Sequence, residues 1–174
     1  MTRTLGSDPT LMGMGRGKDE IYVATMPLRA TKGPAQLLMS AAYSLNLWHL
    51  RHFMLIIKPS TTSISPLSSN SQALVFDFQP QDPENIYVAL AALSGRAVPG
   101  IVHVRKISKM PRKNCWCIGS FNSSNAVEEA YKFNCSWPTD LRVGEHDCRH
   151  YTNGLAEMLT GETNVLERLE NHKE

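Results

Sequence analysis

One short segment near the C-terminal end combines the residue types that thiol chemistry needs. Cys148 lies in the segment 145–151, which reads EHDCRHY. Asp147 is a good N-cap residue, so Cys148 is expected in the first turn of a helix. The dipole and the free N–H groups at a helix start stabilise an anion, so this position favours the thiolate. The segment therefore predicts a cysteine nucleophile, which in turn needs a base and a group that orients the base.

The helix that begins at Cys148 has an apolar stripe. Its members recur at i, i+3, i+4, i+7 and i+11, and they are Cys148, Tyr151, Thr152, Leu155 and Leu159. Side chains at this spacing share one helix face, so the thiol is expected to face a sheet rather than solvent. The helix is predicted to run to about Thr160, with Gly161 as its stop.

Two strands are expected to carry the base and its orienting group. His52 begins the apolar run 53–57, and Asp77 lies inside the next strand, between two phenylalanines. A carboxylate in that setting is expensive to bury without a partner, and an imidazole N–H on the adjacent strand is a suitable one. Antiparallel pairing of the two strands brings His52 near Asp77 or Gln79. These two share one strand face, so either is predicted to orient the ring.

The order of these motifs resembles the circularly permuted papain-like superfamily, which includes lecithin:retinol acyltransferase-like, PPPDE-type and NlpC-type proteins. There a strand of the form His-aromatic-apolar carries the base, and here residues 52–55 read HFML. The cysteine helix of the family often reads Asn-Cys-x-x-Phe, and here residues 147–151 read DCRHY. Asp147 thus replaces the usual asparagine, and Asp77 stands where some members carry a second histidine. The resemblance spans about 52–161.

The resemblance implies a papain-like thiol hydrolase or acyltransferase. Cys148 would attack an ester, thioester or amide carbonyl, His52 would be the base, and Asp77 would orient the ring. Backbone N–H groups at the helix start would hold the oxyanion. A protein or lipid acyl group is the implied substrate, and peptide, isopeptide and lipid-ester bonds all stay open. No cofactor is implied.

The remaining pattern favours an α+β fold, with a small antiparallel sheet and helices packed on it. The other expected elements are strands at 21–26, 100–105 and 114–119 and helices from Gly33-Pro34, over 83–94 with Asp82 as its N-cap, and over 124–133 with Ser123 or Ser124 as its cap. In the last helix, Val127, Ala130 and Tyr131 are expected on the inner face.

Length and composition set the domain organisation. The 174 residues suit one domain at 19–174, preceded by a disordered tail at 1–18 and interrupted by a mobile Ser-rich loop at 59–72. A net charge of +2 is too even for a nucleic-acid partner. The chain has no apolar run of membrane-spanning length and no secretory signal, so a cytoplasmic location is expected, with an organelle transit peptide as the alternative.

Three alternatives compete with thiol catalysis. A zinc-stabilised domain would draw on the metal-competent residues Cys115, Cys117, Cys135, His146, Cys148 and His150, although their spacing fits no closed zinc site well. Asp77 would instead be a structural acid paired with Arg96 or Arg105. The same fold would also serve as a non-catalytic interaction module, with Cys148 as a packed core residue.

Overall fold

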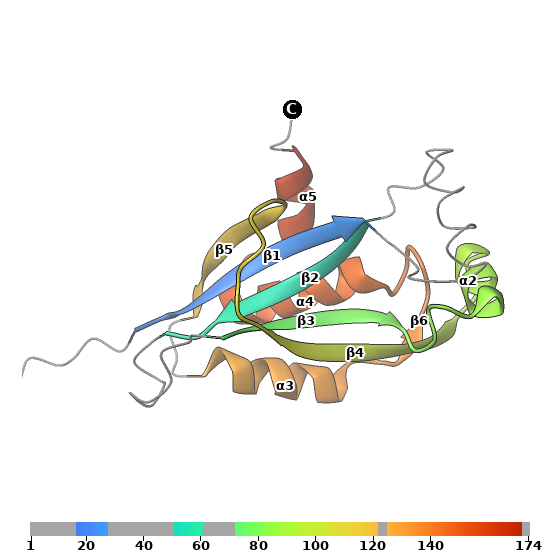
Figure 1. The fold of residues 1–174 in the computed structure, drawn as a ribbon, viewed down its shortest axis with the longest axis horizontal. Helices are drawn as coiled ribbons and strands as arrows, with labels where there is room; N and C mark the ends of the chain where they lie inside the picture. The colour runs from blue at the N-terminus through green and yellow to red at the C-terminus, as the bar shows by residue number, and fades with distance from the viewer. Residues whose placement is uncertain (1–16, 28–50, 61–71, 122–124, 172–174) are drawn as a thin grey trace, which may run out of the picture.

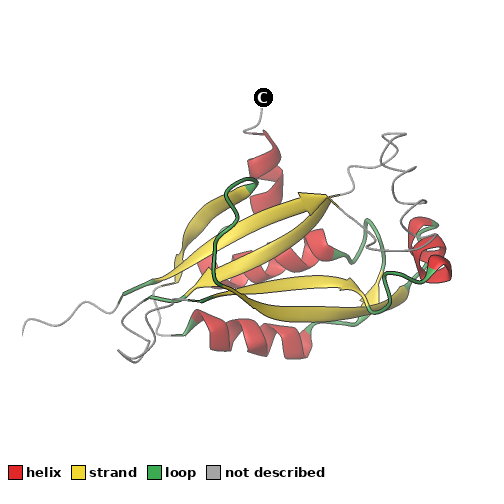
Figure 2. Ribbon diagram, viewed as in Figure 1, coloured by secondary structure: helices red, strands yellow, loops and turns green. Residues whose placement is uncertain are grey.

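An antiparallel sheet of six strands forms the centre of the molecule. The computed structural model describes residues 17–27, 51–60, 72–121 and 125–171. The strands lie in the order β5-β1-β2-β3-β4-β6, and every neighbouring pair is antiparallel. Their bounds are β1 Asp19–Pro27, β2 Arg51–Lys58, β3 Ala73–Pro80, β4 Val98–Ile107, β5 Cys115–Phe121 and β6 Asp140–Leu141. With helices packed on this sheet (Figures 1 and 2), the expected α+β class is confirmed.

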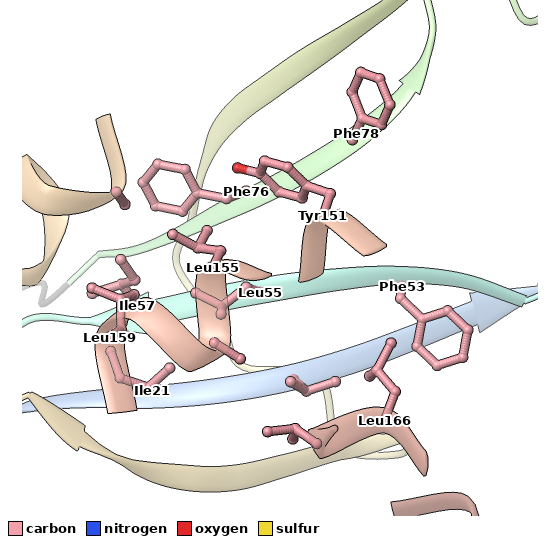
Figure 3. Packing of buried hydrophobic residues seen from close by; sticks show 14 of the residues in the cluster. Ile21, Phe53, Leu55, Ile57, Phe76, Phe78, Tyr151, Leu155, Leu159 and Leu166 are labelled. Atoms are coloured by element: carbon pink, nitrogen blue, oxygen red, sulfur yellow. The ribbon is translucent and has the colours of Figure 1, made fainter. Parts of the chain in front are cut away.

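The larger hydrophobic cluster lies between the sheet and helix α4 (Cys148–Thr160). Phe53, Leu55 and Ile57 alternate along β2 and contribute to this cluster, because successive strand residues point to opposite faces. Tyr151 and Leu155 of α4 face them, and both are fully buried. Figure 3 shows Leu155 over β2 and Tyr151 over β3. The predicted apolar stripe of this helix is therefore confirmed, as is its end at Gly161, whose φ of 75° is the left-handed C-cap conformation.

A smaller cluster covers the opposite face of the same strands. It contains the β2 residues Met54 and Ile56, together with Ala24, Ala73 and Val75, and Met110 packs against it. Met110 belongs to the connection between β4 and β5, which passes over this face of the sheet (Figure 1). Because both faces are covered, residues 53–57 of β2 are all buried. This is the central strand that the apolar run 53–57 predicted.

The pairing between β2 and β3 covers only part of their length. Its register runs from Ile57 with Leu74 to Leu55 with Phe76 and stops there. Beyond this point β2 remains paired with β1 and β3 remains paired with β4, so each strand continues with a different neighbour. The two strand pairs diverge in Figure 1, and α4 lies behind the place where they separate.

Two helix starts differ from those expected. Helix α2 (Ile86–Leu93) begins later than Pro83, and its N-cap is Asn85, whose side chain accepts a hydrogen bond from the N–H of Tyr87. Asp82 instead accepts the Asn85 N–H through its backbone, in a turn that precedes the helix. An Asx side chain directly before the apolar run is the better cap here, because it reaches the unpaired N–H groups of the first turn.

Helix α3 (Ala126–Ser136) is capped by Asn125, which accepts from the N–H of Glu128, and not by Ser123 or Ser124. Ala126 and Ala130 are buried on its inner face, whereas Tyr131 is 46% exposed. Its ring approaches Phe76 of the sheet edge-on. The expectation for Tyr131 was therefore wrong. The two-residue strand β6 had no signal in the sequence, since it forms by pairing with Val98 and Pro99 at the sheet edge.

Several expectations fall outside the described residues. These are most of the tail at 1–18, the helix opening at Gly33-Pro34 and residues 61–71 of the Ser-rich loop. Within the described ranges, no helix has both the length and the apolar character needed to cross a membrane. The last helix, α5 (Val165–Asn171), packs against α4, and Asn153 of α4 accepts a hydrogen bond from the N–H of Leu166.

Candidate active site

His52 and Asp77 are in direct contact at the point where β2 and β3 separate. The ring nitrogen Nε2 of His52 lies 2.9 Å from Oδ2 of Asp77. Because an ionised carboxylate can only accept, Nε2 carries the proton and donates it. His52 is 8% exposed and Asp77 is 0% exposed, so water screens this contact little. Of the two orienting residues that the sequence left open, the structure brings Asp77 to the ring.

The second oxygen of Asp77 faces a cation. Oδ1 of Asp77 lies 3.5 Å from Nη1 of Arg105, on the adjacent strand β4. It is also a buried oxygen with no hydrogen bond from any described residue, so the Arg105 contact is a long ion pair. The sequence offered Arg96 and Arg105 as alternative partners of Asp77. Of these, Arg105 makes a contact, and it does so while Asp77 also holds His52.

Cys148 is the first residue of α4, as the Asp147 cap predicted. One carboxylate oxygen of Asp147, Oδ1, accepts the N–H of Arg149 at 2.9 Å, and Oδ2 accepts the N–H of Gly144 at 2.7 Å. Nδ1 of His150 lies 3.4 Å from the backbone nitrogen of Asp147, which completes the capping box, and 2.9 Å from Oδ1. His150 also follows Cys148 by two residues, about 200° round the helix, so its ring is poorly placed to act as the base for the thiol. The cap rigidly orients the first turn and, with it, the thiol.

The Cys148 side chain lies beside His52. Its sulfur is 4.0 Å from the carbonyl oxygen of Arg51, the residue directly before His52. It is also near enough to His52 to act on the titration of the ring and raise its pKa. Nε2 of the ring is engaged by Asp77, so Nδ1 is the nitrogen that remains for the thiol. The structure thus brings together all three residues that the sequence predicted.

These three side chains come from opposite faces of the sheet. Asp77 alternates with Phe76 and Phe78, which belong to the cluster under α4, so it points to the other face with Val75. Cys148 instead packs against the cluster under α4. A continuous ladder would place backbone between the two sides, and contact is made here because the pairing of β2 with β3 has already stopped at Leu55.

The charge on His52 is set by competing effects. Burial lowers the pKa of its ring and is the largest single influence. The hydrogen bonds to Asp77 and to Cys148, with the negative charges of both groups, together outweigh burial and raise the pKa of His52 to about 9. At neutral pH a ring with this pKa is protonated, so it presents a positive charge to the side chain of Cys148.

Two neighbouring groups complete the electrostatics. Burial raises the pKa of Tyr151, and the charge of Asp77 raises it further, so the phenol stays neutral. Tyr151 donates its O–H to Asn134 of α3 at 2.6 Å. Burial also acts to raise the pKa of Asp147, but the hydrogen bonds of the cap outweigh it and lower that pKa below the usual value. The cap is thus ionised at neutral pH.

Residues outside the predicted set hold the first turn of α4 in place. The guanidinium of Arg149 lies 5.0 Å from the ring centre of Phe53 on β2 and pairs with Glu170 of α5, with its Nη2 3.0 Å from Oε2. A shallow hollow beside this contact, about 210 Å³ including open solvent, is lined in part by Phe53, Trp116 and Leu166. The sequence contains no local signal for these contacts, because α5 approaches β2 only in the folded chain.

The metal-competent residues of the zinc alternative lie on separate elements. Cys115 and Cys117 are on β5 and Cys135 is on α3, and none of the three contacts Cys148 in a metal-binding group. His146 stacks on Trp137, with ring centres 4.5 Å apart. Across the described ranges, no group of three or more His, Cys, Asp or Glu side chains is arranged to hold a metal ion.

Comparisons with known proteins give no relative for this chain. No protein-family model matches the sequence, and neither a curated protein nor a solved structure matches it significantly. What the chain does is therefore inferred from its own geometry and chemistry.

Proposed function

We propose that this chain is a cysteine-dependent hydrolase or acyltransferase that acts on an ester, thioester or amide bond. One observation carries the proposal: a buried histidine holds a carboxylate at 2.9 Å through Nε2 and has a helix-start cysteine beside it. A nucleophile, a base and an orienting group in that order are the arrangement that thiol catalysis requires. The permuted papain-like relationship stays part of this proposal.

The first half of the reaction forms an acyl-enzyme. The Cys148 thiolate attacks the carbonyl carbon, and the electron pair of the C=O bond moves to its oxygen. When that oxyanion collapses, the bond to the leaving group breaks, and the imidazolium of His52 gives its proton to the departing oxygen, sulfur or nitrogen. The products are a thioester on Cys148 and a neutral His52 that is still held by Asp77.

The second half regenerates the thiol group. Neutral His52 takes a proton from water, or from an acceptor alcohol or amine, as that nucleophile attacks the thioester carbonyl. Collapse of the tetrahedral intermediate releases the acid or the transferred acyl product and returns the thiolate beside the imidazolium. The choice between water and another acceptor distinguishes hydrolysis from acyl transfer, and the same three residues serve both.

The oxyanion has one clear donor at the helix start. Asp147 occupies the N–H of Arg149, and its capping box also uses the N–H of the third helical residue. The N–H of Cys148 itself donates to no described residue, so it is the donor we assign to the oxyanion. This narrows the sequence expectation, which placed several N–H groups of the first turn in that role.

A direct test is acylation by a small activated thioester, followed by intact-mass and peptide mapping. We expect one acyl group on Cys148 in the wild-type chain, no adduct in Cys148→Ser, and a much slower adduct in His52→Ala, because the cation beside the thiolate is gone. Cys117→Ser is the matched control, since Cys117 is an exposed thiol on β5. It lies far in sequence from Cys148, His52 and Asp77, the three residues of the proposed relay. Acylation spread evenly over the four cysteines, or unaffected by His52→Ala, would reject the proposal.

A further inference from the structure

Asp77 has one oxygen that the relay leaves without a hydrogen bond. Oδ2 accepts from His52, whereas Oδ1 accepts no hydrogen bond from a described residue although Asp77 is fully buried. A buried carboxylate is stable only if its charge is compensated on both sides. His52 supplies that compensation only while its ring is protonated. The catalytic cycle proposed above requires His52 to lose its proton once in every turnover, so Asp77 then needs a second cation.

Arg105 is placed to be that cation. Its register partner on β3 is Val75, so it projects from the sheet face that Asp77 occupies. Nη1 lies 3.5 Å from Oδ1 of Asp77, and Nη2 lies 3.4 Å from the sulfur of Met54 on β2. The guanidinium therefore reaches from β4 across β3 to β2, beside the point where the β2–β3 pairing ends at Leu55.

We propose that Arg105 is a positioning residue of the relay, which shares the carboxylate of Asp77 with His52 and keeps it aimed at the ring when the ring is neutral. The proposal rests on the catalytic role of His52 given above. The flat, forked guanidinium suits this role, because one nitrogen contacts the carboxylate while the other rests against Met54. An ammonium on a flexible stem contacts only one of these groups at a time.

A cation shared in this way also limits how strongly Asp77 favours the imidazolium. The groups that face the His52–Asp77 pair are Cys148 and Tyr151 from α4, together with His103 and Arg105 from β4. His103 is the register partner of Asp77 and is exposed. Arg105 is the permanent cation in this set. The side chain of Arg105 is 45% exposed, so solvent weakens its influence on the ring without removing it.

The test replaces Arg105 with Met and with Lys and measures the His52 titration by NMR. The His52 ring signal is assigned by its loss in His52→Gln. We expect Arg105→Met to raise the pKa of His52 by about 0.5–1 unit, because Asp77 then has the imidazolium as its main counter-ion. Arg105→Lys should restore at least half of the wild-type value. Lys106→Met, on the next position of β4 and pointing to the other face, is the matched control and should shift nothing.

Turnover supplies the second readout. In Arg105→Met we expect release of the acyl group from Cys148 to slow about 3–10-fold, while Cys148 still becomes acylated, because a more basic His52 remains protonated when it is needed as the base. An unchanged His52 titration in Arg105→Met, or a Lys variant no closer to wild type than the Met variant, overturns the proposal. If the wild-type chain forms no acyl-enzyme, the proposed function fails, whereas the NMR titration still decides whether Arg105 positions Asp77.

Discussion

The paired half and the separated half of strands β2 and β3 bury different kinds of side chain. Where the strands are paired, the β2 side chains from Leu55 to Ile57 are apolar and fully buried. Where they part, the same two strands carry His52 and Asp77, which are also buried but ionisable. A core and a candidate reaction centre therefore lie within a few residues of each other on one pair of strands.

The comparison of the two halves shows which contacts become possible where two strands stop pairing. In the paired half the backbone satisfies its own hydrogen bonds, so the side chains need only exclude water. In the separated half, side chains from the two faces of the sheet can meet, and each buried polar group must find its partner among them. His52 finds Asp77, and Asp77 also finds Arg105. The paired half should therefore set the stability of the fold, and the separated half should set its reactivity.

The largest expected effect comes from removing the charge in the separated half. Asp77→Asn keeps the size of the side chain but removes the anion that holds the His52 ring, so we expect acylation of Cys148 to slow by about 10²–10⁴-fold. The pKa of His52 should fall in the same variant, because burial then opposes its charge with less compensation. Stopped-flow acylation and an NMR titration of the ring measure the two effects. A wild-type rate in Asp77→Asn would remove Asp77 from the relay.

A truncation in the paired half should lower the stability of the fold and leave the acylation rate unchanged. Leu55 is fully buried between β2 and α4, so Leu55→Ala removes apolar contacts and leaves a cavity. We expect the free energy of unfolding to drop by about 2–5 kcal/mol, while the acylation rate of the molecules that remain folded stays close to wild type. Leu90→Ala on the 48% exposed side chain of α2 is the control and should change stability by less than about 0.5 kcal/mol. If the folded molecules of Leu55→Ala also lost reactivity, the paired half would not act on stability alone.

The smallest effect is a pH dependence of stability that originates in the separated half. The folded state raises the pKa of His52 from 6.5 to about 9, so the folded chain binds this proton more tightly than the unfolded chain. The resulting stabilisation is fully present below pH 6.5 and is lost as the pH rises through 9. It amounts to at most about 3 kcal/mol. We expect the difference in unfolding free energy between wild type and His52→Gln, from urea titrations, to shrink over this pH range. A constant or growing difference would mean that folding does not raise the pKa of His52.

The elements that carry the site could be predicted because their signals are local. The continuous apolar run 53–57 and the phenylalanines around Asp77 mark two buried strands, and Asp147 and Gly161 mark the two ends of the cysteine helix. Each signal acts over a few residues through sterics, capping or burial, so it does not depend on the rest of the fold. At α2 the local signal was misread. Asp82 was the predicted cap, but the helix is capped by Asn85, because Asp82 starts a turn of its own.

The residue pattern alone indicates that a buried acid needs a partner and that a cysteine starts a helix. The sequence left open whether Asp77 or Gln79 contacts His52. It also left open whether Arg105 contacts Asp77 instead of His52 or together with it. The folded chain answers both questions, because the answers depend on where the β2–β3 pairing stops and on the register of β4 beside β3. Strand register and the end of a strand pair are set by contacts between residues far apart in the chain. A pattern read along one strand therefore does not contain them.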